Sequence, residues 1–412
     1  MKMHRVCAAA LAALALMWPT AVRAEDYWRL PIGDPARRDR QSPIVLDGIT
    51  DTRTGTVLTP SEMAARLDDV RVVFVGESHT DMAFHRVQLQ VLEELQARGR
   101  PILIGLEMYP YTEQAGLDLW NGGQVSEDEF VTKSRWYKNW GYHWRYYRDI
   151  FLFARQHSIK MFGVNTPRDV VSAVRKKGFQ NLTPEESARI PPRIDIGNEE
   201  HKRLFRAFFA GESGMHSAME GPMFDGMFAA QCTWDASMGY NSVQALRQSG
   251  APNAIMVVLI GSGHVAYGLG IQRQAGLWFD GRMASIIPVA VADGAGRPMG
   301  DVQSSYADFL WGLPREEASL YPSMGFSTRE TASGEPLTII DVPKTSVAGV
   351  AGFAVGDVLL TMDGAPIADR ETLNRLIAGK RWADSAVFTV RRGDQTLTLM
   401  AYFRRQATDE RR

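Results

Sequence analysis

The stretch RVVFVGESH, at residues 71–79, decides the expected fold. Residues 72–75 are all β-branched or aromatic, and such a continuous apolar run predicts a strand buried on both faces in the middle of a parallel sheet. Gly76 ends the run, and Glu77 and His79 follow within three residues. Because ligands of open α/β sheets bind outside the carboxyl ends of the strands, the stretch predicts a functional site at a sheet edge.

Polar residues also follow two other predicted strands. Residues 102–107, ILIGLE, end in a glutamate, and residues 254–260, AIMVVLI, lead into Gly-Ser-Gly-His. The plain alternative is that each polar residue caps a following helix, but capping does not require histidine. We therefore predict one site, suited to a divalent metal or to general acid–base catalysis. Its members are Glu77, His79, Glu107 and His264.

The chain alternates between strand-like and helix-like segments up to about residue 292. Further strands are predicted at 160–164 and 283–292, and helices at 82–98 and 140–158. This alternation predicts an α/β fold with a mostly parallel central sheet flanked by helices. From residue 322 the chain changes to short strands with one helix, which predicts a small β-rich domain.

The first 24 residues are predicted to be a signal peptide. Two basic residues precede an apolar run at 6–18, and Ala21-Val-Arg-Ala24 supplies a small-residue cleavage site. We expect cleavage after Ala24 and a periplasmic or secreted protein. Cys7 lies at the start of the apolar run, so it does not form a lipobox, and Cys232 is the only cysteine expected in the mature chain.

Beyond the signal peptide, four parts are expected. They are an irregular N-terminal arm at 25–58, the α/β domain at 59–295, a linker at 296–321 and the β-rich domain at 322–405. A chain of 412 residues has room for two such domains. Its 46 basic and 47 acidic residues nearly balance, so charge gives no basis for a nucleic-acid partner.

Three more residues are candidates for a functional role. His85 lies in the first turn of the helix that follows His79, where it faces either the site or solvent. Asp235, on a long helix predicted within 213–250, can orient one of the histidines, as carboxylates behind metal-bound histidines do. His216 lies in the same stretch among methionines, which either line a flat apolar ligand such as haem or fill the core.

With these residues in order, the sequence resembles two families. Residues 60–292 resemble the ChaN-like haem-binding domain, in the group that also contains Tiki and TraB proteins and erythromycin esterase. That resemblance rests on Gly76-Glu-Ser-His79, His85, Glu107, residues 230–238 and Gly261-Ser-Gly-His264. Residues 322–405 resemble a bacterial PDZ domain, through Gly325-Phe326, residues 348–364 and the turn at 390–393.

The ChaN resemblance implies an exported protein that binds haem and takes part in haem or iron handling, with haem held between two subunits of a homodimer. Histidine and tyrosine both ligate haem iron. The candidate haem-contacting residues are His85, Tyr109, Tyr111 and His216. In the wider group the four strand-end residues serve metal-dependent peptidase or esterase chemistry, so the alternative function is a metal-dependent hydrolase that uses a divalent metal ion at this site.

The PDZ resemblance implies that the second domain docks a peptide or protein through a free carboxyl terminus. Met324, Gly325 and Phe326 form a turn before a predicted edge strand. Such a turn can bind the peptide carboxylate while the strand pairs with the peptide backbone. No residue of this domain suggests catalysis.

Overall fold

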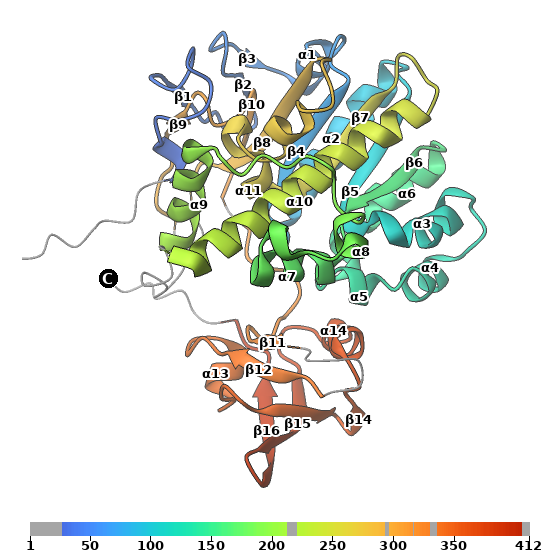
Figure 1. The fold of residues 1–412 in the computed structure, drawn as a ribbon, viewed down its shortest axis with the longest axis vertical. Coiled ribbons are helices and arrows are strands. Elements are labelled where there is room, and N and C mark those ends of the chain that lie inside the picture. The colour runs from blue at the N-terminus through green and yellow to red at the C-terminus, as the bar shows by residue number, and fades with distance from the viewer. Residues whose placement is uncertain (1–26, 212–220, 293–295, 316, 330–335, 406–412) are drawn as a thin grey trace, which may run out of the picture.

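The computed structural model describes residues 27–211, 221–292, 296–315, 317–329 and 336–405. It shows a large α/β domain and, below it in Figure 1, a smaller domain of antiparallel strands. This confirms the predicted fold class. Within the described ranges, no helix is both long enough and apolar enough to cross a membrane. The expected signal peptide and His216 lie outside the described residues.

An eight-stranded sheet forms the centre of the α/β domain in the described part of the chain. Its strand order is β3-β2-β10-β8-β4-β7-β5-β6, and the strands from β10 to β6 run parallel, whereas β2 and β3 extend one edge antiparallel. The bounds are β2 (Ile49–Asp51), β3 (Val57–Leu58), β4 (Val72–Glu77), β5 (Ile102–Pro110), β6 (Lys160–Asn165), β7 (Ile255–Gly261), β8 (Met283–Ala290) and β10 (Phe309–Leu313). β1 (Gln41–Pro43) and β9 (Asp301–Gln303) form a separate antiparallel pair.

Alternate residues of β4 pack on opposite faces of this sheet. Val73 and Val75 belong to the core under α2 (Met82–Ala97), whereas Val72 and Phe74 belong to the core under α10 (Gly221–Gln248). All four side chains are fully buried. Both faces of the strand are therefore covered, which explains why its sequence is continuously apolar instead of alternating.

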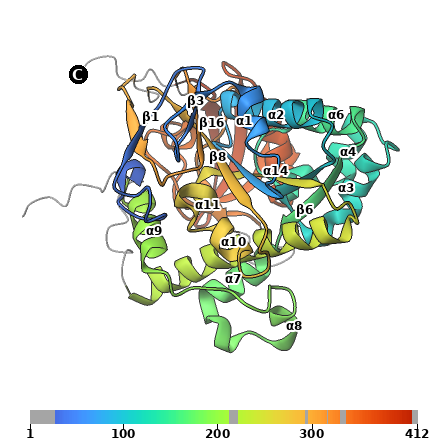
Figure 2. The ribbon, with the colours of Figure 1, turned by 90° about the horizontal axis from the view of Figure 1, so that it is seen from above.

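Helices cover both faces of the sheet, as Figure 2 shows with α2 and α6 on one side and α10 on the other. The first face carries α1 (Pro60–Ala65), α2, α3 (Gln114–Asn121), α4 (Glu127–Lys133), α5 (Trp136–Asn139) and α6 (Arg148–Gln156). The second face carries α9 (Glu199–Gly211), α10, α11 (Ser262–Val265) and α12 (Ile271–Ala275). The helix α7 (Arg168–Lys177) packs against α10, and α8 (Pro184–Ser187) is a short helix that follows it in the chain.

The smaller domain is built on one antiparallel sheet with the order β11-β12-β13-β15-β16, and β14 pairs with β13. Its elements are β11 (Ser327–Arg329), β12 (Thr338–Asp341), α13 (Val347–Val350), β13 (Val358–Met362), β14 (Ala365–Pro366), α14 (Arg370–Ala378), β15 (Ser385–Arg392) and β16 (Gln395–Tyr402). Phe388 and Phe403 are fully buried in its core. β11 is an edge strand.

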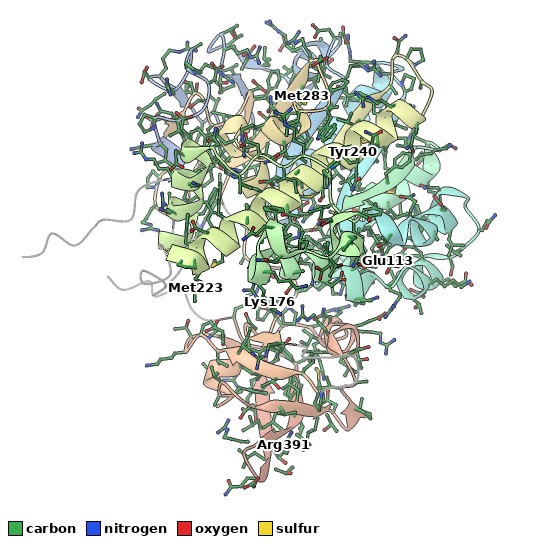
Figure 3. All side chains as sticks on the ribbon, in the orientation of Figure 1. Glu113, Lys176, Met223, Tyr240, Met283 and Arg391 are labelled. Carbon is green, nitrogen blue, oxygen red and sulfur yellow. The ribbon has the colours of Figure 1, made fainter. Side chains whose placement is uncertain are left out.

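The carboxyl ends of the parallel strands point toward the smaller domain. Met283, the first residue of β8, lies at the far end of the α/β domain in Figure 3, whereas Glu113 and Lys176 lie at the near end. The edge predicted to hold the functional residues is therefore the edge that faces the second domain.

Three expected segments differ from the prediction. The arm at 25–58 and the linker at 296–321 both contribute strands, and β10 is fully buried between β8 and β2. The strands β1, β2 and β9 are only three residues long and mixed in polarity, so their sequences give little sign of a strand, whereas β10 is a short apolar run. The helix expected at 140–158 is broken: Trp140 is extended, and a 3-10 turn at Trp144–Tyr146 precedes α6. The His143 side chain accepts a hydrogen bond from the Arg145 backbone N–H, which favours a turn at this point.

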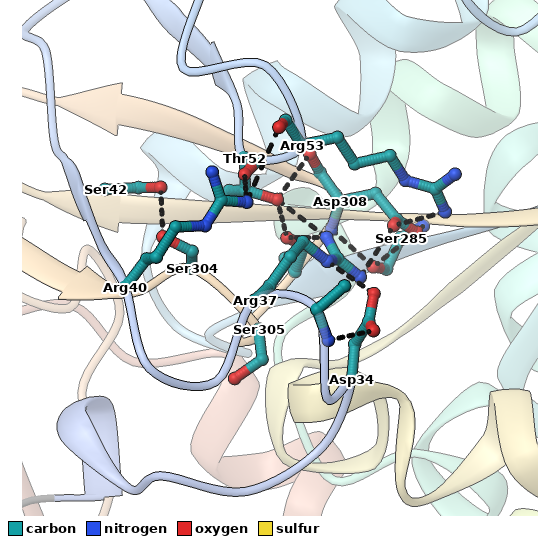
Figure 4. A network of polar contacts seen from close by, with 12 residues as sticks. Asp34, Arg37, Arg40, Ser42, Thr52, Arg53, Ser285, Ser304, Ser305 and Asp308 are labelled. Atoms are coloured by element: carbon teal, nitrogen blue, oxygen red, sulfur yellow. Dashed lines mark hydrogen bonds and ion pairs between the residues drawn. The ribbon is translucent and has the colours of Figure 1, made fainter.

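Arg37 fastens the N-terminal arm to the sheet (Figure 4). Its guanidinium donates to the Thr52 hydroxyl at 2.7 Å and to the Ala307 carbonyl at 3.1 Å, and it lies 3.1 Å from Asp308. The other carboxylate oxygen of Asp308 accepts from the backbone and hydroxyl of Ser285 in β8. A buried ion pair thus joins the arm, β8 and the start of β10.

We expect the Arg37→Ala variant to lower the free energy of unfolding of the α/β domain by about 3–5 kcal/mol, because it leaves the buried Asp308 without its buried partner. Arg53→Ala is the matched control: Arg53 lies 3.0 Å from the same carboxylate oxygen, but its side chain is 54% exposed, so its loss should cost no more than about 1 kcal/mol. Urea denaturation of both variants measures the difference. Equal costs would contradict the role given to Arg37.

Candidate functional site

Three adjacent strands bring the predicted residues together. β7 lies between β4 and β5, and Glu77 at the end of β4 is in register with Gly261 at the end of β7. Glu107 lies near the end of β5, and its carboxylate accepts a hydrogen bond from the Gly261 backbone N–H at 2.7 Å. The site therefore sits at the carboxyl edge of the middle of the sheet, as the sequence predicted.

Glu77 is the buried anchor of the first half of the site. One carboxylate oxygen lies 2.8 Å from His79 Nδ1 and accepts from the Tyr147 hydroxyl at 2.6 Å. The other oxygen accepts from the Gln88 side-chain amide at 2.8 Å and lies 3.5 Å from His85 Nδ1. Burial alone would raise the pKa of Glu77, but the charge of His85 and the hydrogen bond with His79 outweigh it and lower the pKa to about 2. Glu77 is therefore a carboxylate at neutral pH.

His79 is the accessible imidazole of the site, with 28% of its side chain exposed. Its ring packs edge-on against Trp140 at 5.0 Å and tilted against Tyr142 at 4.8 Å between centroids. Burial opposes the charged ring, but the hydrogen bond with Glu77 and the charges of Glu77 and Glu107 raise the pKa of His79. Glu77 thus holds both the position and the charge of this imidazole.

The second half of the site joins Glu107, His264 and Asp235. His264 Nδ1 lies 2.5 Å from Asp235, and its Nε2 lies 3.4 Å from Glu107. Burial would lower the pKa of His264, but Asp235 and then Glu107 raise it to about 10. At neutral pH the ring is an imidazolium that donates to Asp235 and forms an ion pair with Glu107. The ion pair lowers the pKa of Glu107 against the effect of burial. The expectation that Asp235 orients a histidine is confirmed.

Two glycines allow the strand ends to approach this closely. A Cβ on Gly76 would lie 2.7 Å from the Ser262 hydroxyl, and a Cβ on Gly261 would lie 3.1 Å from His79 Cε1. Each glycine therefore does more than end its strand, because a side chain there would push the two halves of the site apart.

The predicted haem-contacting residues fall into different environments. His85 is 2% exposed, and its ring nitrogens lie 3.2 Å from the Gln88 side-chain oxygen and 3.2 Å from the His79 carbonyl, so it packs inside the site and not on a surface. Tyr109 is fully buried, with its hydroxyl 2.7 Å from that of Ser134. Tyr111 is 37% exposed.

The divalent-metal expectation gains no support from the described residues. They contain no group of three or more histidine, cysteine, aspartate or glutamate side chains arranged to hold a metal ion. In this structure both nitrogens of His264 face carboxylates, and His79 Nδ1 faces Glu77.

Several residues of the site were not predicted from the sequence. Tyr147 and Gln88 hold Glu77, Trp140 and Tyr142 form the wall beside His79, and His201 Nε2 lies 3.6 Å from Asp235. Gln88 could have been predicted, since it lies three residues after His85 and therefore on the same face of α2. Nothing in the local sequence marks Tyr147 or Trp140, which reach the site only through the folded path of residues 136–148.

The predicted peptide-binding turn lies where the second domain meets the first. Met324 is buried and its carbonyl accepts from the Ala348 backbone N–H at 2.9 Å, whereas Phe326 packs against Phe353. Gly325 has a φ of +74°, and a Cβ there would lie 2.6 Å from Ser346 Cβ. Only glycine fits this turn without strain.

Comparison with known families identifies both domains. Residues 63–274 match the family described as haem-binding uptake, Tiki superfamily, ChaN. The chain belongs to this family. Residues 322–401 match the PDZ domain, so the second domain is a PDZ domain. No curated protein matches the chain.

Among solved structures, ChaN of Campylobacter jejuni, described with cofacial haem binding, aligns with a TM-score of 0.50 at 18% identity, over 64% of this chain and 95% of that one. This likeness supports the ChaN fold. The erythromycin esterase EreC, as a His→Asn mutant, gives a TM-score of 0.39 at 10% identity, over 66% of this chain and 98% of that one. The HtrA3 PDZ domain, bound to a phage-derived ligand, gives a TM-score of 0.19 at 18% identity, over 20% of this chain and 85% of that one.

The raised pKa of His264 predicts how stability depends on pH. The folded value of about 10 lies above the ordinary value of 6.5, so the imidazolium contributes its full stability below pH 6.5 and loses it as the pH rises through 10. We expect the melting temperature of the protein to fall more steeply between pH 6.5 and pH 10 than that of His264→Gln. His157→Gln, which changes an exposed histidine, should keep the steep slope. Parallel slopes for all three proteins would refute the assignment.

Proposed function

We propose that this protein is exported to the periplasm or secreted, binds haem through its ChaN domain in the service of haem or iron handling, and docks partner proteins through its PDZ domain. The family match over residues 63–274 is the observation that carries the haem assignment. The leader-like residues 1–24 support export. ChaN of C. jejuni is described with cofacial haem binding, and two facing haems need two binding surfaces, which supports a homodimer.

Tyr111 is the described candidate best placed to contact haem iron. Tyr111 is exposed, and within the described residues its hydroxyl donates one long hydrogen bond, at 3.4 Å, to the Arg189 carbonyl. Tyr111 would supply a phenol oxygen to the iron of a bound haem, a ligand that haem iron accepts. Tyr109 is two residues earlier, and its buried hydroxyl is already paired with Ser134.

Expression of the full sequence with its own leader tests export and haem binding together. We expect the purified protein to have lost residues 1–24, as measured by intact mass, and to give a saturable Soret band on titration with hemin. Light scattering of the saturated sample should report a dimer. Retention of the leader would refute export, and the absence of any saturable spectral change would refute haem binding.

The two tyrosines provide a matched pair for the ligand assignment. Tyr111→Phe should shift the Soret band and weaken hemin binding, because phenylalanine has no oxygen for the iron. Tyr109→Phe removes the same atom from a buried position and should leave the spectrum unchanged. An unchanged Soret band in Tyr111→Phe would show that Tyr111 is not the ligand of the haem iron.

A further inference from the structure

A cavity of about 420 Å³ lies between the two domains, within the size range of ligand pockets. The PDZ side of the wall consists of residues 322–328 and the helix α14, and the ChaN side consists of residues 140–143 and Arg168. Trp140 and Tyr142 in this wall are the same residues that pack against His79. The cavity therefore adjoins the candidate site and is completed by both domains.

Polar contacts join the two domains beside the cavity. Asn374 of α14 donates to the Tyr137 carbonyl at 3.0 Å, and His143 Nε2 donates to the Ala378 carbonyl at 3.1 Å. Arg135 pairs with Glu371 at 2.9 Å. These contacts come from positions 371, 374 and 378 of α14, and Leu373 and Ile377 of the same helix add apolar surface to the cavity wall.

The PDZ side of the cavity has the parts needed to pair with a peptide. β11 is an edge strand that pairs with β12 on one side, and Ser327 and Thr328 line the cavity on the other. Phe326, Leu373 and Ile377 provide an apolar surface beside the turn at Gly325. An extended peptide can add to such an edge with its carboxylate at the turn.

The charged side chains that line the cavity within the described residues are both positive. Arg168 and Arg370 are its charged lining residues, and no carboxylate lines it among the described residues. His143 is neutral at pH 7, because burial and then the charge of Arg381 lower its pKa to about 4. Neither arginine forms an ion pair within the described ranges. In the part of the chain that the structure describes, Arg370 Nε is buried without a hydrogen-bond partner, and Arg168 makes a single hydrogen bond, to the Asn139 carbonyl.

The relative positions of β11 and α14 show which residue of a bound peptide would meet these arginines. Arg370 donates to the Thr328 carbonyl at 3.0 Å, so the start of α14 lies beside Thr328. Thr328 is three residues from Gly325, about 10 Å along a strand, and Ile377 is seven residues from Arg370, about 10 Å along a helix. Side chains alternate along an extended peptide. A terminal residue at Gly325 therefore directs its own side chain and that of the third residue from the end toward α14.

We infer that the interdomain cavity binds a peptide carboxyl terminus with an apolar last residue and an aspartate or glutamate third from the end, whose carboxylate pairs with Arg370 and Arg168. The inference rests on the proposed docking function of the PDZ domain and adds the class of partner. It also makes the ChaN domain part of the peptide site, because Arg168 belongs to α7.

The test uses the mature full chain and two fluorescent hexapeptides that differ only at the third residue from the end, one finishing in Glu-Ala-Val and the other in Gln-Ala-Val. Fluorescence anisotropy should show the glutamate peptide binding at least about tenfold more tightly, as expected for charge-assisted hydrogen bonds. Arg370→Gln and Arg168→Gln should each reduce this preference. Arg375→Gln should keep it, since Arg375 lies on the same helix, is exposed and does not line the cavity.

The possible outcomes separate the docking function from the inference. If neither peptide binds, and the melting temperature shows the chain folded, PDZ docking itself fails. If both peptides bind equally well, docking stands and the acidic preference is refuted. If Arg168→Gln keeps the full preference, the ChaN domain takes no part in recognition. Arg168→Gln loses one hydrogen bond at an accessible position, so its folding is not at risk.

Discussion

The structure depends on a buried carboxylate at the end of the central strand. Glu77 is fully buried, and it stays ionised because Tyr147, Gln88, His79 and His85 surround its two oxygens. Burial of an ionised carboxylate costs free energy unless both of its oxygens are paired, so the positions of its partners are restricted. They come from α2, from the turn after β4 and from the start of α6. The pairing of one side chain thus fixes how three segments meet at the sheet edge.

The sequence predicted the parts of the fold and site that follow from local pattern. Continuous apolar runs located β4, β5 and β7, and the polar residues directly after them, Glu77, His79, Glu107 and His264, meet as expected. Asp235 was predicted to orient a histidine because a helix covering the sheet brings its carboxylate to the strand ends. In each of these cases, the position of the residue at the end of its strand or on the face of its helix determines that it lies at the sheet edge.

The parts that depend on long-range pairing were not predictable. β10 was predicted as part of a linker because glycines and prolines surround its five apolar residues, and its place between β8 and β2 depends on long-range pairing. The arm before residue 59 is held by the contact of Arg37 with Asp308. The aromatic segment 140–158 looked like one helix, but it breaks so that Trp140 and Tyr142 can contact His79. A metal site was expected from the two histidines and two carboxylates at neighbouring strand ends, and it stays a prediction. In the structure His79 and His264 are each paired with a carboxylate.

The broken segment also gives the two domains a common wall. Trp140 and Tyr142 touch His79 on one side and line the interdomain cavity on the other, and His143 bonds to the end of α14. A ligand that fills the cavity would contact the same aromatic rings that pack against the imidazole. The peptide groove of the PDZ domain and the candidate site of the ChaN domain are therefore adjacent, with these two side chains between them in the described structure.

The central claim, that the sheet-edge site and the peptide groove share this wall, is tested most directly by nuclear magnetic resonance of the histidine ring Cε1–H groups. His79 can be assigned from the spectrum of His79→Gln. Addition of the Glu-Ala-Val peptide to saturation should shift the His79 signal, because Trp140 and Tyr142 change position or ring orientation, and it should leave exposed His157 unchanged. A His79 signal that does not move when the groove is full would contradict the account.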